Sequence, residues 1–412
     1  MVPGTLPHDP VHPVDAAVVA DLARLIDDRA RDLVALRRDL HAHPELAWHE
    51  QRTTDAVCTH LESAGVVVKR VDTTGLIAEI GPADGPVVAL RADMDALPVP
   101  DETSDPWRST VEGVAHACGH DVHTAALTGA GLALADVHRR SPLPYRVRLL
   151  FQPAEEIMPG GAQTLIAAGA LDDVERIFAL HCDPTLDVGR VGLRHGPLTG
   201  ASDALTVTLT GRGGHTSRPH LTEDLVFAIG VLVTQLPSAL SRRLDPRAGA
   251  SLVWGMVRAG EPLNVIPARG RLGGTLRMLD ATAWHEAEHL VRHLVRNLLE
   301  PYGVTASVDY VRGVPPVVND PVATEELGNA VTGTLGESAL VPTRQSLGGE
   351  DFAWYVETVP GAMGRLGTRS PGGPTFDLHQ GNLRIDDRAT VAAAKVLSVV
   401  AVSAGRPRLA IT

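Results

Sequence analysis

The sequence predicts an α/β protein: a domain with a mostly parallel sheet, interrupted by a smaller domain of ferredoxin-like βαββαβ type. Three observations support this prediction. Strand-like and helical segments alternate through the first 198 residues, which is typical of a layered domain with a largely parallel sheet. The run Pro86–Leu90 is almost entirely apolar and suits a central strand buried on both faces. Near Gly200 the pattern changes to strands that alternate apolar and polar residues.

The first domain is expected to begin with helices. Apolar residues recur at helical spacing from Ala16 to Leu40, which predicts one long helix. A second helix should follow Glu50 and run to about Ala64, where Gly65 stops it. The other segments expected here are strands at Val66–Val68, Leu76–Ala78, Pro86–Leu90, Tyr145–Phe151 and Ile177–Leu180, and helices at His123–Val137 and Ala162–Ala168.

The inserted domain should cover residues 199–312. Its segments follow the order strand, helix, strand, strand, helix, strand, which is that of a split βαβ sandwich. They are a strand from Leu205 to Thr210, helices at Leu225–Leu240 and Trp284–Leu299, and strands at Leu252–Met256, Leu272–Met278 and Val304–Val311. After Pro315 the α/β pattern resumes, with helices at Glu325–Leu335 and Ala389–Ala404. The larger domain is therefore expected in two parts, 1–198 and 313–412.

Composition restricts the partners and the location. The net charge of −12, from 37 basic and 49 acidic residues, argues against nucleic acid or an anionic membrane as the main partner. Three cysteines give no disulfide framework and fit a reducing compartment. The segment Met1–Pro13 lacks the basic start and apolar stretch of a signal peptide, and no apolar run reaches the length of a membrane span. We therefore expect a cytoplasmic protein.

Two short motifs suggest metal chemistry. Cys118 and His120 are two residues apart and can face one metal ion from a loop, and Gly119 between them permits a tight turn. Glu155 and Glu156 follow the strand that ends near residue 151, at the edge where α/β sheets place their sites. One of two adjacent carboxylates can bind a metal ion while the other acts as a general base toward water.

Three histidines complete the pattern. His181 follows an apolar strand, His215 follows a strand of the inserted domain, and His379 precedes the last helix. Taken singly, each motif has an ordinary interpretation, such as a buried cysteine, a solvated acidic turn or a core histidine. Taken together, they supply the thiolate, imidazole and carboxylate donors that two transition-metal ions need. The candidate ligands are Cys118, His120, Glu156, His181 and His379.

The chain resembles the di-metal aminoacylase/carboxypeptidase superfamily, in the amidohydrolase branch that includes hippurate hydrolases and indoleacetyl-amino-acid hydrolases. The matching stretches occur in the family order and span nearly the whole chain. They are Leu36–Leu46, Leu90–Pro98, His116–Asp121, Phe151–Glu156, Gly213–His215 and Gly348–Phe352.

The resemblance implies a role for each matching residue. It implies two divalent ions, Zn or Mn, with Co or Ni also permitted, held by the five candidate ligands. Glu155 would be the general base, and Asp93 would adjust the site from just outside the ligands. His215 would reach from the partner subunit of a homodimer, or of a higher homo-oligomer, and stabilise the tetrahedral oxyanion. Substrate contacts would come from Asn264, Arg277, Gly348 and Gly349. His41 and His43, although they look like ligands, belong to a stretch that the family uses structurally.

The resulting hypothesis is hydrolysis of the amide bond of N-acyl amino acids or related conjugates by a metal-activated water. One alternative is a dipeptidase or carboxypeptidase. Two others are a non-catalytic relative that binds acyl amino acids and a protein in which metals only stabilise the fold. Glu155 beside a full ligand set argues against these last two, because structural zinc sites are usually closed four-ligand cages. Cys182 departs from the aromatic or aliphatic residue of relatives, and we expect it to be a small buried hydrophobe.

Overall fold

The computed structural model describes residues 16–72 and 74–405, so the expectations for the first 13 residues lie outside the described part. The chain forms two compact units. Of the described residues, the first unit contains those from 16 to 196, Val318–Arg344 and those from 354 to 405. The second contains Pro197–Val317 and Gln345–Ala353. Each unit is described by itself.

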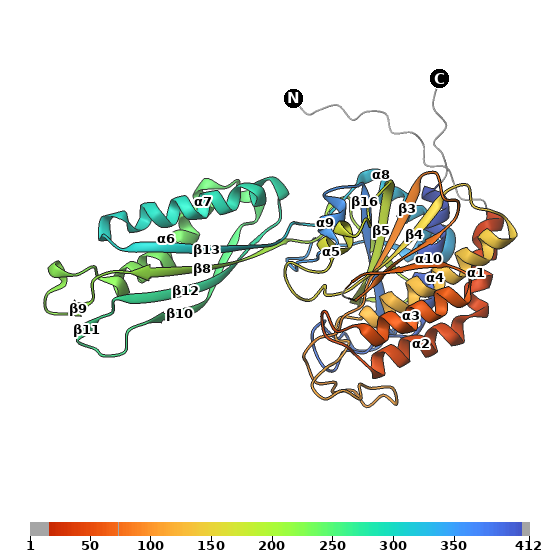
Figure 1. Cartoon of the computed structure of the whole chain (residues 1–412), viewed down its shortest axis with the longest axis horizontal. Coiled ribbons are helices and arrows are strands. Elements are labelled where there is room, and N and C mark those ends of the chain that lie inside the picture. The colour runs from red at the N-terminus through yellow and green to blue at the C-terminus, as the bar shows by residue number, and fades with distance from the viewer. Residues whose placement is uncertain (1–15, 73, 406–412) are drawn as a thin grey trace, which may run out of the picture. The chain divides into compact units, whose positions relative to one another are not determined.

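The first unit is built around an eight-stranded sheet in the order β1-β2-β4-β3-β5-β16-β6-β15 (Figure 1). Its four central strands are parallel: β4 (Arg146–Gln152), β3 (Val87–Asp93), β5 (Val174–Asp187) and β16 (Gly361–Arg369). The outer strands are β1 (Val67–Arg70), β2 (Leu76–Ile80), β6 (Val191–Leu193) and β15 (Leu340–Pro342). Every residue of β3 is buried, as expected for a strand covered on both faces. The predicted α/β class with a mostly parallel sheet is confirmed.

Helices cover this sheet. They are α1 (Ala16–Asp28), α2 (Ala30–Ala42), α3 (Gln51–Ser63), α4 (His120–Arg140), α5 (Ala162–Ala167), α8 (Pro321–Leu335), α9 (Ala353–Val356) and α10 (Arg388–Ala404). The prediction of one helix from Ala16 to Leu40 was wrong, because the helix breaks at Arg29. The Arg29 guanidinium donates to the carbonyl oxygen of Leu25 and pairs with Asp136 of α4. The break at Arg29 therefore coincides with a tertiary contact to α4, which the helical periodicity of the sequence could not predict.

Strand β16 lies at the centre of the sheet but was not among the expected strands. Its sequence contains glycine at 361, 364 and 367 and lacks a β-branched run, so its strand propensity is low. The packing explains the glycines. A Cβ on Gly361 would lie 2.5 Å from the carbonyl oxygen of Ile177, and one on Gly367 would lie 2.1 Å from that of Asp187. Close approach to β5 therefore requires glycine at these positions.

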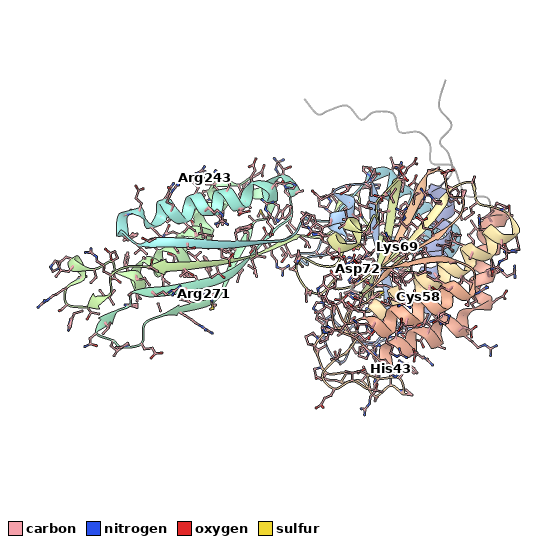
Figure 2. The ribbon with its side chains drawn as sticks, in the orientation of Figure 1. His43, Cys58, Lys69, Asp72, Arg243 and Arg271 are labelled. Carbon is pink, nitrogen blue, oxygen red and sulfur yellow. The ribbon has the colours of Figure 1, made fainter. Side chains whose placement is uncertain are left out.

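The second unit has a four-stranded antiparallel sheet in the order β10-β12-β8-β13. Its elements are β8 (Ala201–Thr210), α6 (Leu225–Arg243), β10 (Ser251–Ala259), β12 (Arg269–Met278), α7 (Ala281–Leu299) and β13 (Thr305–Val314). The chain order is βαββαβ, and the first strand lies between the third and the fourth, as in a split βαβ sandwich. Figure 2 shows Arg243 on the helical side of this unit and Arg271 on its sheet.

Short elements complete the chain. They are β7 (Gly196–Pro197), β9 (Gly214–His215), β11 (Val265–Ile266), β14 (Val318–Asn319) and the 3-10 helices Pro219–Leu221, Pro246–Ala248, Glu300–Tyr302 and Glu337–Ala339. Strands β9 and β11 pair with each other. Residues 345–353, which the sequence analysis assigned to the larger domain, belong to the second unit. The amide of Gly200, for example, donates to the carbonyl oxygen of Gly348 over 3.1 Å.

Within the described residues, α6 is the one helix whose length and composition would allow it to cross a membrane. This differs from the expectation that no apolar segment reaches that length. A single such helix is weak evidence, because core helices pass the same test. One face of α6, which includes Leu225, Leu232 and Leu240, is buried in the second unit.

Candidate metal centre

The five predicted metal ligands come from four parts of the first unit. Cys118 directly precedes α4, and His120 is the first residue of that helix. Glu156 follows β4. His181 lies inside β5 rather than after its end, as the sequence had suggested. His379 lies in the loop before α10 and has a left-handed backbone with φ of 62°, and its amide donates to the carbonyl oxygen of Ala117 over 2.7 Å.

The ligand atoms form two groups that share a cysteine. Those of Cys118, His120 and His181 all lie within 4.8 Å of one another, and so do those of Cys118, Glu156 and His379. In the first group, Cys118 Sγ is 3.5 Å from His181 Nε2. In the second, His379 Nε2 is 3.3 Å from Glu156 Oε1. This arrangement fits two ions bridged by one thiolate, with imidazole and carboxylate donors around them.

Two of the imidazoles are held in the form that a metal ion requires. His120 Nδ1 is 2.9 Å from the carbonyl oxygen of Asp95, and His181 Nδ1 is 2.9 Å from that of Cys182. A carbonyl oxygen only accepts hydrogen bonds, so Nδ1 carries the proton in both rings. In the neutral form of each ring the lone pair is then on Nε2, where it can bind a metal ion.

Unpartnered buried atoms provide a test of whether a cation fits. His120 Nε2 is buried and has no hydrogen-bond partner, and Glu156 Oε1 is buried beside His379 Nε2 at 3.3 Å without forming a hydrogen bond to it. Buried polar atoms are nearly always hydrogen-bonded, so each exception needs an explanation. Both atoms belong to the two groups of candidate ligands. A divalent ion in each group would satisfy them, so the residues present fit the predicted metal centre.

The electrostatics of the centre also favour cations. Burial, together with the carboxylates of Glu156 and Glu155, raises the pKa of the Cys118 thiol well above its ordinary value. Burial lowers the pKa of His120, but nearby carboxylates, first that of Asp93, overcome this and raise it to about 10. The protein alone thus favours a neutral thiol and a protonated imidazole. Divalent ions would reverse both preferences and stabilise the thiolate and the neutral ring.

Asp95 holds the loop that carries the two glutamates. Its Oδ1 accepts from the amide of Glu155 over 3.0 Å, and its Oδ2 accepts from the amide of Glu156 over 2.9 Å. The backbone turns sharply at Ala154, where φ is 54°, and the amide of Ala154 donates to Glu50 over 2.9 Å. Asp95 was not among the predicted site residues, although it lies in the matching stretch Leu90–Pro98.

Asp93 and His123 form a second buried pair next to His120. Asp93 Oδ2 accepts from Arg91 over 2.6 Å, and Asp93 Oδ1 accepts from His123 Nδ1 over 2.5 Å. His123 Nε2 accepts from the amide of Cys182 over 2.8 Å. Both ring nitrogens of His123 are therefore engaged, and the ring has no lone pair left for a metal ion. In the sequence, His123 is marked only by its place in a predicted helix.

Gly119 and Cys182 pack closely beneath the centre. Gly119 has φ of 87°, and a Cβ on it would lie 2.7 Å from Cys182 Sγ. Cys182 is buried, as expected, and its Sγ lies 3.7 Å from the carbonyl oxygen of Gly119. Burial raises the pKa of this thiol well above its ordinary value.

His41 and His43 do not belong to either ligand group. His41 is buried, and its Nδ1 lies 2.9 Å from Asp121, whose carboxylate also lies 2.7 Å from Arg37 Nε. His43 ends α2, where its Nδ1 lies 2.8 Å from the carbonyl oxygen of Asp39 (Figure 2). Their contacts are those of structural residues.

The predicted substrate residues of the second unit lie in two places. His215 is paired with Val265, and the amide of Thr216 donates to the carbonyl oxygen of Asn264 over 3.2 Å, which brings His215 and Asn264 together. Arg277 Nη1 donates to the carbonyl oxygen of Leu347 over 2.7 Å, which places Arg277 beside Gly348 and Gly349.

These two places lie at opposite ends of β12. Arg269 begins the strand near the β9–β11 pair, and Arg277 lies almost at its other end, opposite Ser202 of β8. A strand rises by about 3.4 Å per residue, so the two places are roughly 30 Å apart.

Comparison with known proteins identifies the family. Residues 89–402 match the family model described as peptidase family M20/M25/M40. The chain belongs to this family. The N-acetylcysteine deacetylase of Bacillus subtilis is 37% identical over 373 residues, which cover 90% of this chain and 96% of that protein. The predicted recognition of a metallopeptidase-related hydrolase is confirmed, and the chain is a metal-dependent amidohydrolase.

Two further comparisons add detail. A solved Bacillus subtilis structure, described as a dinuclear metal-binding peptidase of the M20 family, is 34% identical with a TM-score of 0.80 and covers 92% of this chain and 99% of that one. A Rhodococcus jostii protein named as a glutamate–cysteine ligase is 51% identical over 368 residues, or 89% of this chain. The chain spans only 46% of that relative's length, so the relative's name describes a larger protein.

Proposed function

We propose that this amidohydrolase cleaves N-acyl amino acids, with two divalent ions held by Cys118, His120, Glu156, His181 and His379. The observation that carries the proposal is the pair of ligand groups that share Cys118, with Glu155 beside them. Glu155 is 6% exposed, and its Oε2 lies 3.9 Å from His120 Nε2. Glu155 lies next to His120 of the first ligand group and Glu156 of the second, and each group already has three ligands without it. The N-acetylcysteine deacetylase activity named for one relative supports this substrate class.

Glu155 is the proposed general base. Two divalent ions, when bound, would polarise the scissile carbonyl and lower the pKa of the attacking water. Glu155 takes one proton from that water while the water oxygen forms a bond to the carbonyl carbon. It then delivers the proton to the nitrogen as the C–N bond breaks. The products are a carboxylic acid and a free amine.

His215 is the proposed donor to the oxyanion. The amide of Ser217 donates to His215 Nδ1 over 3.1 Å, so in the neutral ring Nδ1 is an acceptor and the proton is on Nε2. The Nε2–H group is then the donor that a tetrahedral oxyanion needs. A donor of this kind contributes about 10²- to 10³-fold to kcat.

The spacing along β12 supports a role for His215 in a second copy of the chain. A dipeptide-sized substrate spans roughly 7 Å. It cannot contact Arg277, Gly348 and Gly349 at one end of β12 and His215 at the other. If Arg277, Gly348 and Gly349 bind substrate in the site of their own chain, His215 and Asn264 must act in the site of a partner chain. The proposed assembly is therefore a homodimer whose sites are complete only as a pair.

Strand β10 is the proposed pairing edge. It is an edge strand of the second unit, and its Val253 and Val257 are 60% and 51% exposed. Long edge strands with exposed apolar side chains pair readily with another chain. We also propose a reducing compartment such as the cytoplasm, because all three cysteines are unpaired and oxidation of Cys118 would remove the shared ligand.

The test uses metal-stripped protein to which Zn, Mn, Co or Ni is restored. The substrates are N-acetyl, N-benzoyl and N-indoleacetyl amino acids, N-acetylcysteine and a dipeptide. Glu155→Gln is compared with Glu102→Gln, an exposed surface control. We expect metal-dependent turnover that falls by at least about 10²-fold in Glu155→Gln alone. Equal turnover in both variants would reject Glu155 as the base. Preference for the dipeptide would favour a peptidase, and binding without turnover would favour a binding protein.

A further inference from the structure

The end of the second unit carries an unusual set of exposed aliphatic side chains. We define the tip as Leu221, Leu263 and Val265, which lie on the two chain segments that carry His215 and its strand partner. Leu263 is 99% exposed, more than any other large hydrophobic side chain in the described part of the chain. Leu221 is 57% and Val265 is 45% exposed. Apolar clusters of this kind mark surfaces that are covered in the working protein.

Backbone pairing and hydrogen bonds connect the tip to His215. Val265 is the strand partner of His215 in the β9–β11 pair, and its amide donates to the carbonyl oxygen of Pro262 over 3.3 Å. Leu221 follows the same turn, where its amide donates to the carbonyl oxygen of Arg218 over 3.1 Å. Leu263 directly precedes Asn264. Any movement that brings His215 and Asn264 to a substrate therefore brings the tip with them.

The substrate has an amino-acid half and an acyl half, and their chemistry indicates which half the tip contacts. This step rests on the proposed function, in which His215 donates to the oxyanion at the centre of the substrate. The polar groups of Arg277 and of residues 348–349 suit the carboxylate of the amino-acid half, for which a guanidinium is well shaped. The half that remains is the acyl group. His215 is followed by an exposed polar turn, Thr216–Arg218. The exposed aliphatic side chains of the tip lie on the same two segments, and they suit an apolar acyl group.

We propose that Leu263, supported by Val265 and Leu221, selects apolar acyl groups in the metal site of a second copy of this chain. The tip thus contacts the acyl group of the substrate. Leu263 is a specificity residue in this proposal, because it contacts the group that differs between substrates and leaves the reacting bonds to other residues.

The experiment varies the acyl group and keeps one amino acid. Formyl, acetyl, butyryl, hexanoyl and succinyl conjugates are assayed with the zinc- or manganese-loaded wild type, Leu263→Ser and Leu263→Asp. The control is Val67→Ser, which changes a side chain that is 74% exposed on β1 of the first unit. Light scattering gives the oligomeric state of every variant.

We expect Leu263→Ser to lower kcat/KM for the hexanoyl conjugate by about 10- to 100-fold and for the formyl and acetyl conjugates by less than about 3-fold. Leu263→Asp should lower hexanoyl turnover further and further disfavour the succinyl conjugate, which carries a like charge. Val67→Ser should behave as wild type.

An equal fall for all conjugates, or no change, overturns the proposal while the proposed function stands. A variant that no longer forms the oligomer overturns it as well, because the tip is then a contact between subunits. If the wild type cleaves none of the conjugates although metal is bound, the proposed function fails, and the assignment of the tip fails with it.

Discussion

At the scale of single residues, hydrogen bonds decide which histidines can bind metal. His120 and His181 each donate from Nδ1 to a carbonyl oxygen and leave Nε2 for an ion. The His123 ring centroid lies 5.4 Å from that of His120 and 5.1 Å from that of His181, but Asp93 and the amide of Cys182 engage both of its nitrogens. Motif spacing contains no information on these partners, which come from β3, the segment just after it and β5. The sequence therefore predicts a set of ligands, whose atoms the structure brings into two groups, but it does not predict the residues that orient them.

His123 gives a direct prediction. His123→Phe should keep two metal ions per chain but lower the free energy of unfolding by about 3 kcal/mol, because Asp93 loses a hydrogen-bond donor and the buried amide of Cys182 loses its acceptor. Metal analysis and denaturant unfolding measure the two quantities, with His60→Phe on α3 as a control. A loss of one ion per chain would show that His123 is a ligand after all.

Asp95 gives a second prediction. Asparagine has one acceptor oxygen where aspartate has two, so Asp95→Asn must lose at least one of the bonds to the amides of Glu155 and Glu156. We expect metal affinity to fall by about 10- to 100-fold, with a fall in kcat that persists at saturating metal. Isothermal titration and steady-state kinetics test this. Asp55→Asn, on the surface of α3, should change neither quantity, and an unchanged Asp95→Asn would mean that the loop is held by other contacts.

At the scale of elements, β16 shows what propensity cannot reveal. Its glycines make it a poor strand by composition, yet Leu366 pairs with Cys182 and Arg365 pairs with His181 at the centre of the sheet. Helices and strands with clear apolar periodicity, such as β3, β4 and α3, were predicted because their own residues determine their burial. β16 was missed because its conformation depends on close contact with β5.

Glycine substitutions test this interpretation. Gly367→Ala places a methyl group 2.1 Å from a backbone oxygen, so we expect a loss of about 1–3 kcal/mol in the free energy of unfolding. Gly333→Ala in α8 meets no atom within 4 Å and should instead stabilise the protein by about 0.5–1 kcal/mol. Denaturant unfolding should give opposite signs for the two variants. The same sign would show that steric contact with β5 does not explain the glycine.

The contact between α2 and α4 should make stability depend on pH. Burial lowers the pKa of His41, but the carboxylates of Asp121 and Asp101 overcome this effect and hold it above its ordinary value. A group whose pKa is raised by folding stabilises the protein fully below its unfolded pKa, about 6.5, and loses this effect as pH rises through the folded value.

His41→Gln should therefore be about 3 kcal/mol less stable than wild type near pH 6, and this gap should shrink as pH rises. Both proteins are unfolded in denaturant from pH 6 to 9 at a fixed metal concentration, so that pH effects on metal binding cancel in the difference. A gap that is constant or grows with pH would contradict a charged His41.

At the scale of the whole molecule, the sequence predicted a βαββαβ insertion but not the distance between its functional ends. His215, Asn264, Arg277 and residues 348–349 were all assigned to the substrate by resemblance alone. The register of β12 separates them into two groups roughly 30 Å apart. Such a separation depends on strand pairing between segments far apart in the chain, which local patterns do not encode. It is also the reason to expect that one site needs two chains.

Mixing two inactive variants tests this expectation. In a mixed dimer of Glu155→Gln and His215→Ala chains, one site receives its glutamate from the His215→Ala chain and its histidine from the Glu155→Gln chain. That site is intact, and the other site lacks both groups. Random re-association makes half of the dimers mixed, so activity should return to about a quarter of the wild-type value. If each site used its own His215, every site would lack one group, and mixing would restore no activity. Recovery that increases with the time allowed for subunit exchange would show that the intact sites form as chains re-pair.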